Sequence, residues 1–403
     1  MSTDVDAPTT ARPGTVSGSG NVIVSGPLDD RPSGRAILPA RSYTGRAEFD
    51  HEQQAIFSSG WVWAGFTHWV AAPGDVKPLT VGGRPLLMMR GDDEVVRVFH
   101  NACRHRGMAL TEEPIQVTKR IQCAYHCWSY NLDGSLAVAP HYKRERRTSP
   151  DTEVKDALGL LPVASESWAG MVFVNLMGGD LDAVAPPLAD LLAPLQQRWA
   201  HIDMDRLHLT QERPFDIDAN WKLVVENFLD FYHLPFIHPQ VGSVAASLDV
   251  DDVVVDSEIL GGCYPRGAAG KAAKTDQPLP WLGDVPAEML ERQDIFCVFP
   301  NALLFLEADW FQVIGFEPIA PDRTVEHMAV FVDRAAGNED FAPALKRLCE
   351  VLYEVNEQDL PILHKLQAGR HSPGSDRTSL VSYWDQITAH FQALVARRAG
   401  YSG

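Results

Sequence analysis

The sequence predicts an α+β protein with a small antiparallel β domain over residues 60–175 and a larger α+β domain over residues 176–403. In the first range, short strand-like runs such as "WVWAGFTHWV" and "GMVFVNL" are separated by Gly, Pro and Asp. In the second range, strand-like runs such as "TVEHMAVFVD" are mixed with segments of helical periodicity such as "ANWKLVVENFLDFYH". The change in pattern near residue 175 indicates two domains.

The N-terminal 59 residues precede the β domain. Residues 1–35 are rich in Ser, Thr, Gly, Pro and Asp and can bury little apolar surface, so we expect a disordered arm. Residues 36–59 are expected to form a helical segment that packs on the larger domain. Within the β domain, further strands are predicted at "PLLMMR", "VVRVFHNA" and "RIQCAYHCWSYNL", with turns at "LDGS" and "GGDL".

The larger domain is expected to end in helices. "IFCVFPNALLFLEADWFQVIGFEPI" predicts strands, and "APALKRLCEVLYEVNEQDLPILHKLQAG" predicts one long helix. Pro361 lies inside this helix and is expected to kink it, because proline removes a backbone hydrogen bond. A tail helix is predicted at "SLVSYWDQITAHFQALVARRA".

Composition excludes several function classes. The formal net charge is −18, which argues against nucleic acid or an anionic membrane as the main partner. There is no run of 18 apolar residues and no basic n-region with an apolar h-region, so we expect neither a transmembrane helix nor a signal peptide. Six cysteines in 403 residues are too few for a disulfide scaffold, and a cytoplasmic location fits best.

Four metal-ligand residues occur in two tight pairs, Cys103-x-His105 and Cys123-x-x-His126, separated by seventeen residues. Structural zinc is one interpretation, since Cys2His2 suits that ion. Zinc fingers usually group Cys with Cys and His with His, whereas each pair here holds one of each. This interleaving favours a [2Fe–2S] cluster with two thiolates on one iron and two imidazoles on the other.

A second group of ligands is predicted at "WKLVVENFLDFYHLPFIHPQ". Asp230 and His233 are three residues apart and would share one face of a helix. Pro235 and Pro239 would end that helix and let His238 turn back toward His233. Two histidines and one carboxylate can hold a mononuclear iron with open positions. The segment "EVNEQDLPI" offers three candidates for the carboxylate, which are Glu354, Glu357 and Asp359.

The motifs "CRHRG" and "CAYHCWSYNLDGSL", followed by "DFYHLPFIH", resemble those of the large (α) subunits of Rieske non-haem iron oxygenases. The resemblance extends over residues 38–370 and implies an antiparallel catalytic sheet covered by helices, of the START or helix-grip type. It implies that Cys103 and Cys123 bind one cluster iron, and that His105 and His126 bind the other. It also assigns His233, His238 and Asp359 to the mononuclear iron, with Glu357 as the next choice to Asp359.

The resemblance further implies a homotrimer, in which Asp230 bridges His126 of one subunit and His233 of the next. A separate NAD(P)H-dependent reductase, and in some systems a ferredoxin, would supply the electrons, because the chain carries no flavin or nucleotide motif. O2 would then be used to hydroxylate, dioxygenate or oxidatively demethylate a small organic substrate. The family usually has glycine where this chain has Cys127, and we expect Cys127 to be a small buried packing residue.

Two other classes remain to be tested, which are a Rieske electron-transfer protein without oxygenase activity and a zinc-structured binding protein. The substrate pocket is expected to draw on residues 228–243 and on strands around 295–315, including Phe299, Phe305 and Phe311. Arg104 and Arg106 have no role assigned by the sequence.

Overall fold

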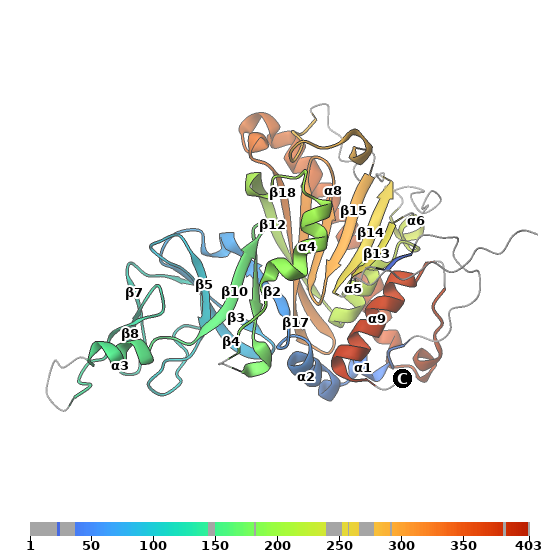
Figure 1. The fold of residues 1–403 in the computed structure, drawn as a ribbon. Coiled ribbons are helices and arrows are strands. Elements are labelled where there is room, and N and C mark those ends of the chain that lie inside the picture. Colours follow the sequence, from blue (N-terminus) through green and yellow to red (C-terminus); the bar gives the residue numbers. More distant parts are fainter. Residues whose placement is uncertain are drawn as a thin grey trace, which may run out of the picture.

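The computed structural model describes residues 22–24, 37–143, 150–180, 183–238, 252–256, 258–265, 278–290, 292–381 and 384–401. Within these ranges every strand pairing is antiparallel and the strands form three sheets, which confirms the α+β class. Figure 1 shows the β domain on one side of the molecule and the larger sheet with its helices on the other.

The β domain contains a seven-stranded and a three-stranded sheet among the described residues. The larger one consists of β2 (Trp61–Phe66), β3 (Asp75–Val81), β4 (Arg84–Arg90), β5 (Val96–His100), β6 (Ile115–Gln116), β10 (Pro162–Trp168) and β11 (Met171–Asn175). The smaller one consists of β7 (Arg120–Gln122), β8 (Ser129–Asn131) and β9 (Leu136–Val138). The segment predicted as one run at 120–132 is therefore two short strands, β7 and β8, separated by a turn.

The third sheet has eight strands in the order β1-β13-β14-β15-β16-β17-β18-β12 in the part of the chain that is described. Their bounds are β1 (Val22–Val24), β12 (Leu207–Ile217), β13 (Asp252–Asp256), β14 (Ile259–Pro265), β15 (Arg292–Val298), β16 (Ala302–Leu306), β17 (Phe311–Ala320) and β18 (Arg323–Asp333). Three residues of the predicted disordered arm thus form a strand that pairs with β13, and the prediction is wrong there. The rest of that arm lies outside the described residues.

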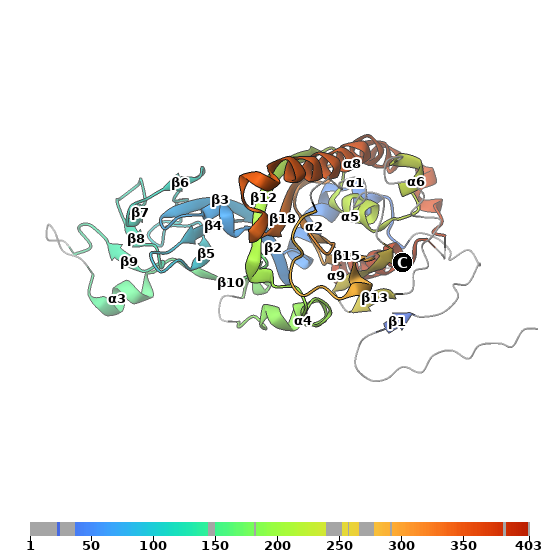
Figure 2. The ribbon, with the colours of Figure 1, turned by 90° about the horizontal axis from the view of Figure 1, so that it is seen from above.

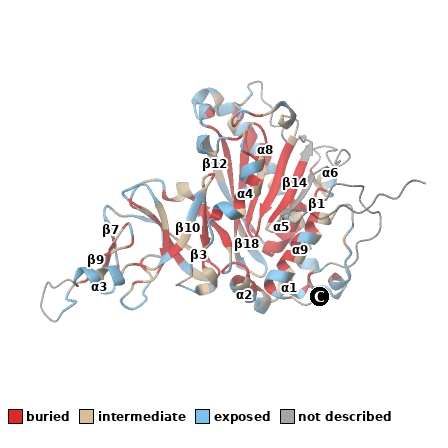
Figure 3. Ribbon diagram, in the orientation of Figure 1, coloured by how far each residue is buried: buried red, intermediate tan, exposed pale blue. Residues whose placement is uncertain are grey.

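Helices cover both faces of the eight-stranded sheet (Figure 2). The helices are α1 (Arg41–Thr44), α2 (Arg46–Ala55), α3 (Thr152–Ala157), α4 (Leu188–Arg198), α5 (Trp221–Leu229), α6 (Leu234–Ile237), α8 (Ala342–Gly369) and α9 (Gln386–Ala399). Because side chains alternate along a strand, Leu303 of β16 packs in the core under α5, α8 and α9, while Leu304 packs with α4 on the other face. Figure 3 shows the resulting buried sheet between partly exposed helices.

The tail helix α9 begins at Gln386, so the prediction of a helix from residue 379 is wrong at residues 379–381 and 384–385, whereas residues 382–383 lie outside the described residues. Asp385 explains the late start. Its side-chain Oδ2 accepts a hydrogen bond from the backbone N–H of Val381, at 2.5 Å. Aspartate side chains compete with the helical hydrogen-bond pattern in this way, and so favour helix ends and turns over helix interiors.

The β domain and the eight-stranded sheet share a core. The backbone N–H and C=O of Trp63, on β2, both bond to the side chain of Asn301, each at 2.9 Å. The Trp63 ring lies against the backbone of Gly315 on β17, where an added Cβ would come within 2.1 Å of the ring. Glycine at this position is what allows the close approach of the two sheets.

Candidate metal centres

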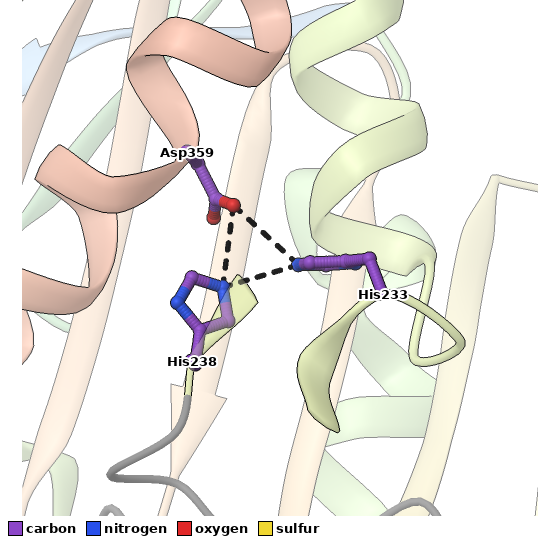
Figure 4. Close-up of side chains that lie close together, drawn as sticks. All are labelled: His233, His238 and Asp359. Atoms are coloured by element: carbon purple, nitrogen blue, oxygen red, sulfur yellow. Dashed lines mark hydrogen bonds and ion pairs between the residues drawn. The ribbon is translucent and has the colours of Figure 1, made fainter. Parts of the chain in front are cut away.

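Three side chains converge beside the eight-stranded sheet (Figure 4). The Nε2 atoms of His233 and His238 are 3.2 Å apart. Asp359 Oδ1 lies 3.5 Å from His233 Nε2 and 3.2 Å from His238 Nε2. Among the described residues, these three form the single group of His, Cys, Asp or Glu whose ligand atoms all lie within 4.8 Å of one another.

The two histidines come from an irregular segment. α5 ends at Leu229, so Asp230 and His233 do not share a helix face as predicted, although Asp230 Oδ2 is 3.3 Å from His233 Nδ1. His233 and His238 flank the four-residue α6, and Pro235 lies in its first turn, where proline is tolerated. α6 therefore turns the chain so that both imidazoles point to one place. Pro239 lies outside the described residues.

The carboxylate comes from the long helix α8, which has the predicted bounds and continues through Pro361. Asp359 is on the face toward the histidines. Glu357 instead forms an ion pair with Arg213, at 2.6 Å, and its side chain is 47% exposed. Glu354 is exposed. Of the three carboxylates that the sequence left open, the geometry brings Asp359 to the histidines.

Buried polar atoms in this group suit a cation. Asp359 Oδ1 and His233 Nδ1 are buried and have no hydrogen-bond partner within the described part of the chain. Burial lowers the pKa of the His238 imidazole, but its contacts with the Asp359 carboxylate and the Gln358 side-chain oxygen outweigh burial, so that the pKa is raised above its ordinary value of 6.5. A carboxylate oxygen facing two imidazole nitrogens at this spacing is the donor set of a 2-His-1-carboxylate iron site. The residues present therefore fit a mononuclear iron.

The second group of candidate ligands lies on two similar turns of the β domain. In one, Gly107 N–H donates to Cys103 O at 2.8 Å, and in the other Cys127 N–H donates to Cys123 O at 3.0 Å. Gly107 has φ +74° and Cys127 has φ +59°, so both are in the left-handed region. Cys127 is exposed, and the prediction that it is a buried packing residue is wrong. It takes the left-handed backbone conformation of the glycine in the matching turn.

The turns hold two pairs of ligands at different depths. Cys103 and Cys123 are each 2% exposed, whereas His105 and His126 are exposed, with their Nδ1 atoms 3.1 Å apart. No three of these four residues bring their ligand atoms within 4.8 Å of one another in the described structure. One zinc ion with bonds of about 2.0–2.3 Å needs its four ligand atoms closer together than these are. A buried thiolate pair and an outer imidazole pair instead fit the two irons of a [2Fe–2S] cluster.

Comparison with known proteins agrees with this geometry. Residues 60–157 match the Rieske [2Fe-2S] domain, and residues 202–400 match the ring hydroxylating alpha subunit (catalytic domain). The carnitine monooxygenase oxygenase subunit of Acinetobacter pittii is 33% identical over 370 residues, which cover 89% of this chain and 94% of that protein.

The chain belongs to the Rieske non-haem iron oxygenases. A glycine betaine monooxygenase oxygenase subunit from Chromohalobacter salexigens is 35% identical over 217 residues, or 53% of this Rieske oxygenase and 46% of the relative. A solved quaternary ammonium Rieske monooxygenase, CntA, has a TM-score of 0.68 and 26% identity, and the alignment covers 90% of this chain and 95% of that one. Naphthalene 1,2-dioxygenase, at 20% identity and a TM-score of 0.68, shares the fold.

This family membership fixes the chemistry at the level of class. The Rieske oxygenase chain is an oxidoreductase whose cofactors are a [2Fe–2S] cluster and a mononuclear iron, with O2 as cosubstrate. Neither a zinc-structured binding protein nor a pure electron-transfer protein agrees with these relatives. They are oxygenase components that belong to multicomponent systems. None of the helices described here has the length and apolar character required to cross a membrane.

The three residues predicted to bind the mononuclear iron of this Rieske oxygenase lie beside a cavity of about 120 Å³. Among the described residues its lining is largely apolar, with several amides: Asn227, Phe228, Asp230, Phe231, His233, Leu234, His238, Gln293, Ile295, Phe305, Gln312, Ile314, Met328, Leu352, Val355, Asn356 and Asp359. Phe305 lines it as predicted. Phe299 and Phe311 do not, and that prediction is wrong.

Strand alternation explains these two errors. Gln312 pairs with Phe305 across β16 and β17 and shares its face, so the adjacent Phe311 points to the α4 side. Phe299 follows the end of β15 and packs on Trp221 and Phe391. Residues 239–243 of the predicted pocket lie outside the described residues.

Sequence reasoning missed the partners of the predicted ligands. Tyr130 Oη lies 3.2 Å from Cys103 Sγ and accepts a hydrogen bond from Arg104 N–H at 2.9 Å. Gln358 Oε1 lies 2.8 Å from His238 Nδ1. Tyr130 lies within "CAYHCWSYNLDGSL" and Gln358 within "EVNEQDLPI", but neither residue has a role assigned by the sequence. The Arg104 side chain donates to a backbone carbonyl, and Arg106 lies over the Tyr125 ring, so both arginines have local contacts.

Proposed function

We propose that this chain is the terminal oxygenase of a multicomponent system that monooxygenates a small quaternary ammonium compound. The observation that carries the proposal is the convergence of His233, His238 and Asp359 on one point beside an apolar cavity. Phe228, Phe231 and Phe305 line that cavity, and aromatic faces attract cationic ammonium groups. The carnitine and glycine betaine monooxygenases among its relatives support this substrate class.

In this proposal Cys103, His105, Cys123 and His126 bind the cluster, in a domain spanning 60–175. The iron is bound by His233, His238 and Asp359, in a domain spanning residues 176–403. The segment 36–59 packs against this domain. When bound, the iron binds and activates O2 with electrons received from the cluster. The apolar lining of the cavity orients the substrate and limits the entry of water.

Electron transfer between subunits is part of the proposal. β7 and β8, which flank one of the cluster turns, lie at the far end of the molecule from α6 in both views (Figures 1 and 2). A head-to-tail homotrimer would place the exposed His126 of one subunit against Asp230 of the next. Asp230 Oδ2 already lies 3.3 Å from His233 Nδ1, and its side chain is 30% exposed. It can therefore orient His233 and still reach a partner's imidazole.

The other components follow from the same reasoning. A separate NAD(P)H-dependent reductase, with or without a ferredoxin, supplies electrons to the cluster. The chain works in the cytoplasm, where such reductases and reduced thiols are found. The cysteines in the described part of the chain are free, which agrees with that location.

The test is substrate screening with a surrogate reductase, following O2 uptake against product formed by mass spectrometry. The panel contains quaternary ammonium compounds with and without a carboxylate, together with aromatic hydrocarbons. Coupled O2 uptake with an ammonium compound supports the proposal. Turnover of the aromatic hydrocarbons alone would favour a ring dioxygenase, as in the 2,4-dinitrotoluene dioxygenase system, whose large component is 27% identical over 319 residues.

A variant test addresses the subunit bridge. Asp230→Asn keeps the size of the side chain but removes its charge, so the cluster should still be reduced by the reductase while O2 uptake falls. Glu357→Gln is a matched control on α8, where the partner of Glu357 is Arg213 of β12. Unchanged O2 uptake in Asp230→Asn would show that this carboxylate does not bridge the two centres.

A further inference from the structure

The His238 imidazole is held at both nitrogens by neighbouring residues of one helix. Its side chain is 0% exposed. The Nε2 atom of His238 lies 3.2 Å from Asp359 Oδ1, and its Nδ1 atom lies 2.8 Å from Gln358 Oε1. Asp359 and Gln358 are adjacent residues of α8. The backbone N–H of His238 bonds locally, to Leu234 O at 3.0 Å. α8 is therefore what fixes the ring relative to the sheet.

The Gln358 contact selects the metal-binding tautomer of His238 once a metal occupies Nε2. An amide oxygen accepts hydrogen bonds and cannot donate one, so the Nδ1 proton of a metal-bound imidazole is donated to Gln358 Oε1. Asp359 Oδ1 is also an acceptor, so without a metal the two contacts compete for the ring proton. When the proton lies on Nδ1, the Nε2 lone pair faces His233 and Asp359. In the other tautomer Nε2 would carry the proton and could not bind a metal, and the Gln358 oxygen would face an unprotonated nitrogen.

The two histidines have unlike partners. His233 Nδ1 faces the carboxylate of Asp230 at 3.3 Å, and that side chain is 30% exposed. His238 Nδ1 faces a neutral amide, and the His238 side chain is 0% exposed. Loss of the Gln358 acceptor would leave the buried Nδ1–H of His238 without a hydrogen-bond partner, which is costly.

We propose that Gln358 is a positioning residue that sets the metal-binding tautomer of His238 and so controls how firmly the mononuclear site retains its metal. The inference rests on the proposed function, because it requires His238 to be a ligand. Outer partners of ligating histidines typically contribute about 10- to 100-fold to metal affinity. We expect a loss of that size when the acceptor is removed.

The experiment measures Co²⁺ binding to the full chain after the mononuclear iron has been removed with a chelator, with the cluster left in place. Binding of the metal is followed by isothermal titration, and the cluster by its own absorbance. Gln358→Met keeps the unbranched shape but has no strong acceptor, and should weaken Co²⁺ binding about 10- to 100-fold. Gln358→Glu restores an acceptor and should bind Co²⁺ much more tightly than Gln358→Met.

Controls separate this inference from the site assignment. Glu357→Gln changes the adjacent residue, whose partner is Arg213, and should bind Co²⁺ like the wild type. His238→Ala should lose Co²⁺ binding, and retention there would overturn the proposed site itself. If His238→Ala behaves as expected but Gln358→Met binds like the wild type, the role of Gln358 is wrong. Equal losses in Gln358→Met and Gln358→Glu would also overturn it, since packing would then be the cause. Gln358→Leu takes the place of Gln358→Met if that variant does not fold.

Discussion

Lys222 and Glu52 form an ion pair in the core that ties α2 to α5, the helix that leads to Asp230 and His233. The Lys222 Nζ lies 2.8 and 2.7 Å from the two oxygens of Glu52, and both side chains are 0% exposed. Trp221 Nε1 and Tyr401 Oη also donate to Glu52, at 2.8 and 2.7 Å. Burial lowers the pKa of Lys222, although the charge of Glu52 opposes this.

Lys222→Met removes the positive charge and leaves the Glu52 carboxylate buried with its two neutral donors. Breaking a buried pair in this way costs about 3–5 kcal/mol. For a domain of this size each kcal/mol lowers the unfolding midpoint by about 2–4 °C, so the expected loss is roughly 6–20 °C. Thermal unfolding followed by circular dichroism measures the midpoint.

The matched control is Lys346→Met on the surface of α8. Lys346 pairs with Glu350 at 3.8 Å, with side-chain exposures of 75% and 53%. Such pairs contribute about 0–1 kcal/mol, so the midpoint should change little. Combining Lys222→Met with Glu52→Gln should recover part of the loss, because no buried charge remains unpaired. A midpoint for Lys222→Met equal to that of the control would refute the reasoning.

Three other predictions concern the backbone angle of Cys127, the packing of Gly315 against Trp63, and the charge of His327. Cys127→Gly places glycine at φ +59° and should stabilise the β domain by about 1 kcal/mol in denaturant unfolding, with unchanged cluster absorbance; a destabilised variant would contradict this. Gly315→Ala puts a Cβ within 2.1 Å of the Trp63 ring and should cost about 1–3 kcal/mol, and a neutral effect would show that the sheets can separate there. The third prediction concerns the pair of His327 and Glu212. Burial raises the pKa of Glu212, but hydrogen bonds from His327 and other donors outweigh burial and lower the pKa from 4.5 to about 2. Burial lowers the pKa of His327, but hydrogen bonds to carboxylates outweigh burial and raise the pKa above 6.5. The stability that the His327 charge contributes is therefore fully present below pH 6.5 and is lost as pH rises through the raised pKa, so His327→Gln should cost more at pH 5.5 than at pH 9; equal losses would count against this charge.

Much of the fold could be predicted because its signals are local. The bounds of α8 were predicted correctly, since its helical periodicity continues through Pro361. The strands of the β domain were predicted from short apolar runs between turn residues. The convergence of His233 and His238 was also expected, although the reason was different. The sequence predicted that the end of a longer helix would turn the chain. In the structure α5 ends at Leu229, and the separate short helix α6 turns the chain.

Features that depend on long-range contacts could not be predicted. Residue types and spacing alone left Glu354, Glu357 and Asp359 open, and the resemblance favoured Asp359. The structure separates Asp359 from Glu357, because Asp359 faces the histidines and Glu357 pairs with Arg213. Phe305 and Phe311 are both apolar strand residues, and the register of β16 against β17 decides which one lines the cavity. Gln358 is an ordinary polar residue in sequence, and its contact with His238 spans 120 positions. Cys127 is exposed and has a positive φ, and composition reveals neither property.

The iron content of the purified chain tests the central claim most directly. A [2Fe–2S] cluster plus one mononuclear site gives about three irons per chain in the wild type. Asp359→Ala should reduce this to about two irons while the cluster absorbance stays unchanged, because the two sites have separate ligands. About two irons in the wild type, or no loss of iron in Asp359→Ala, would contradict the account.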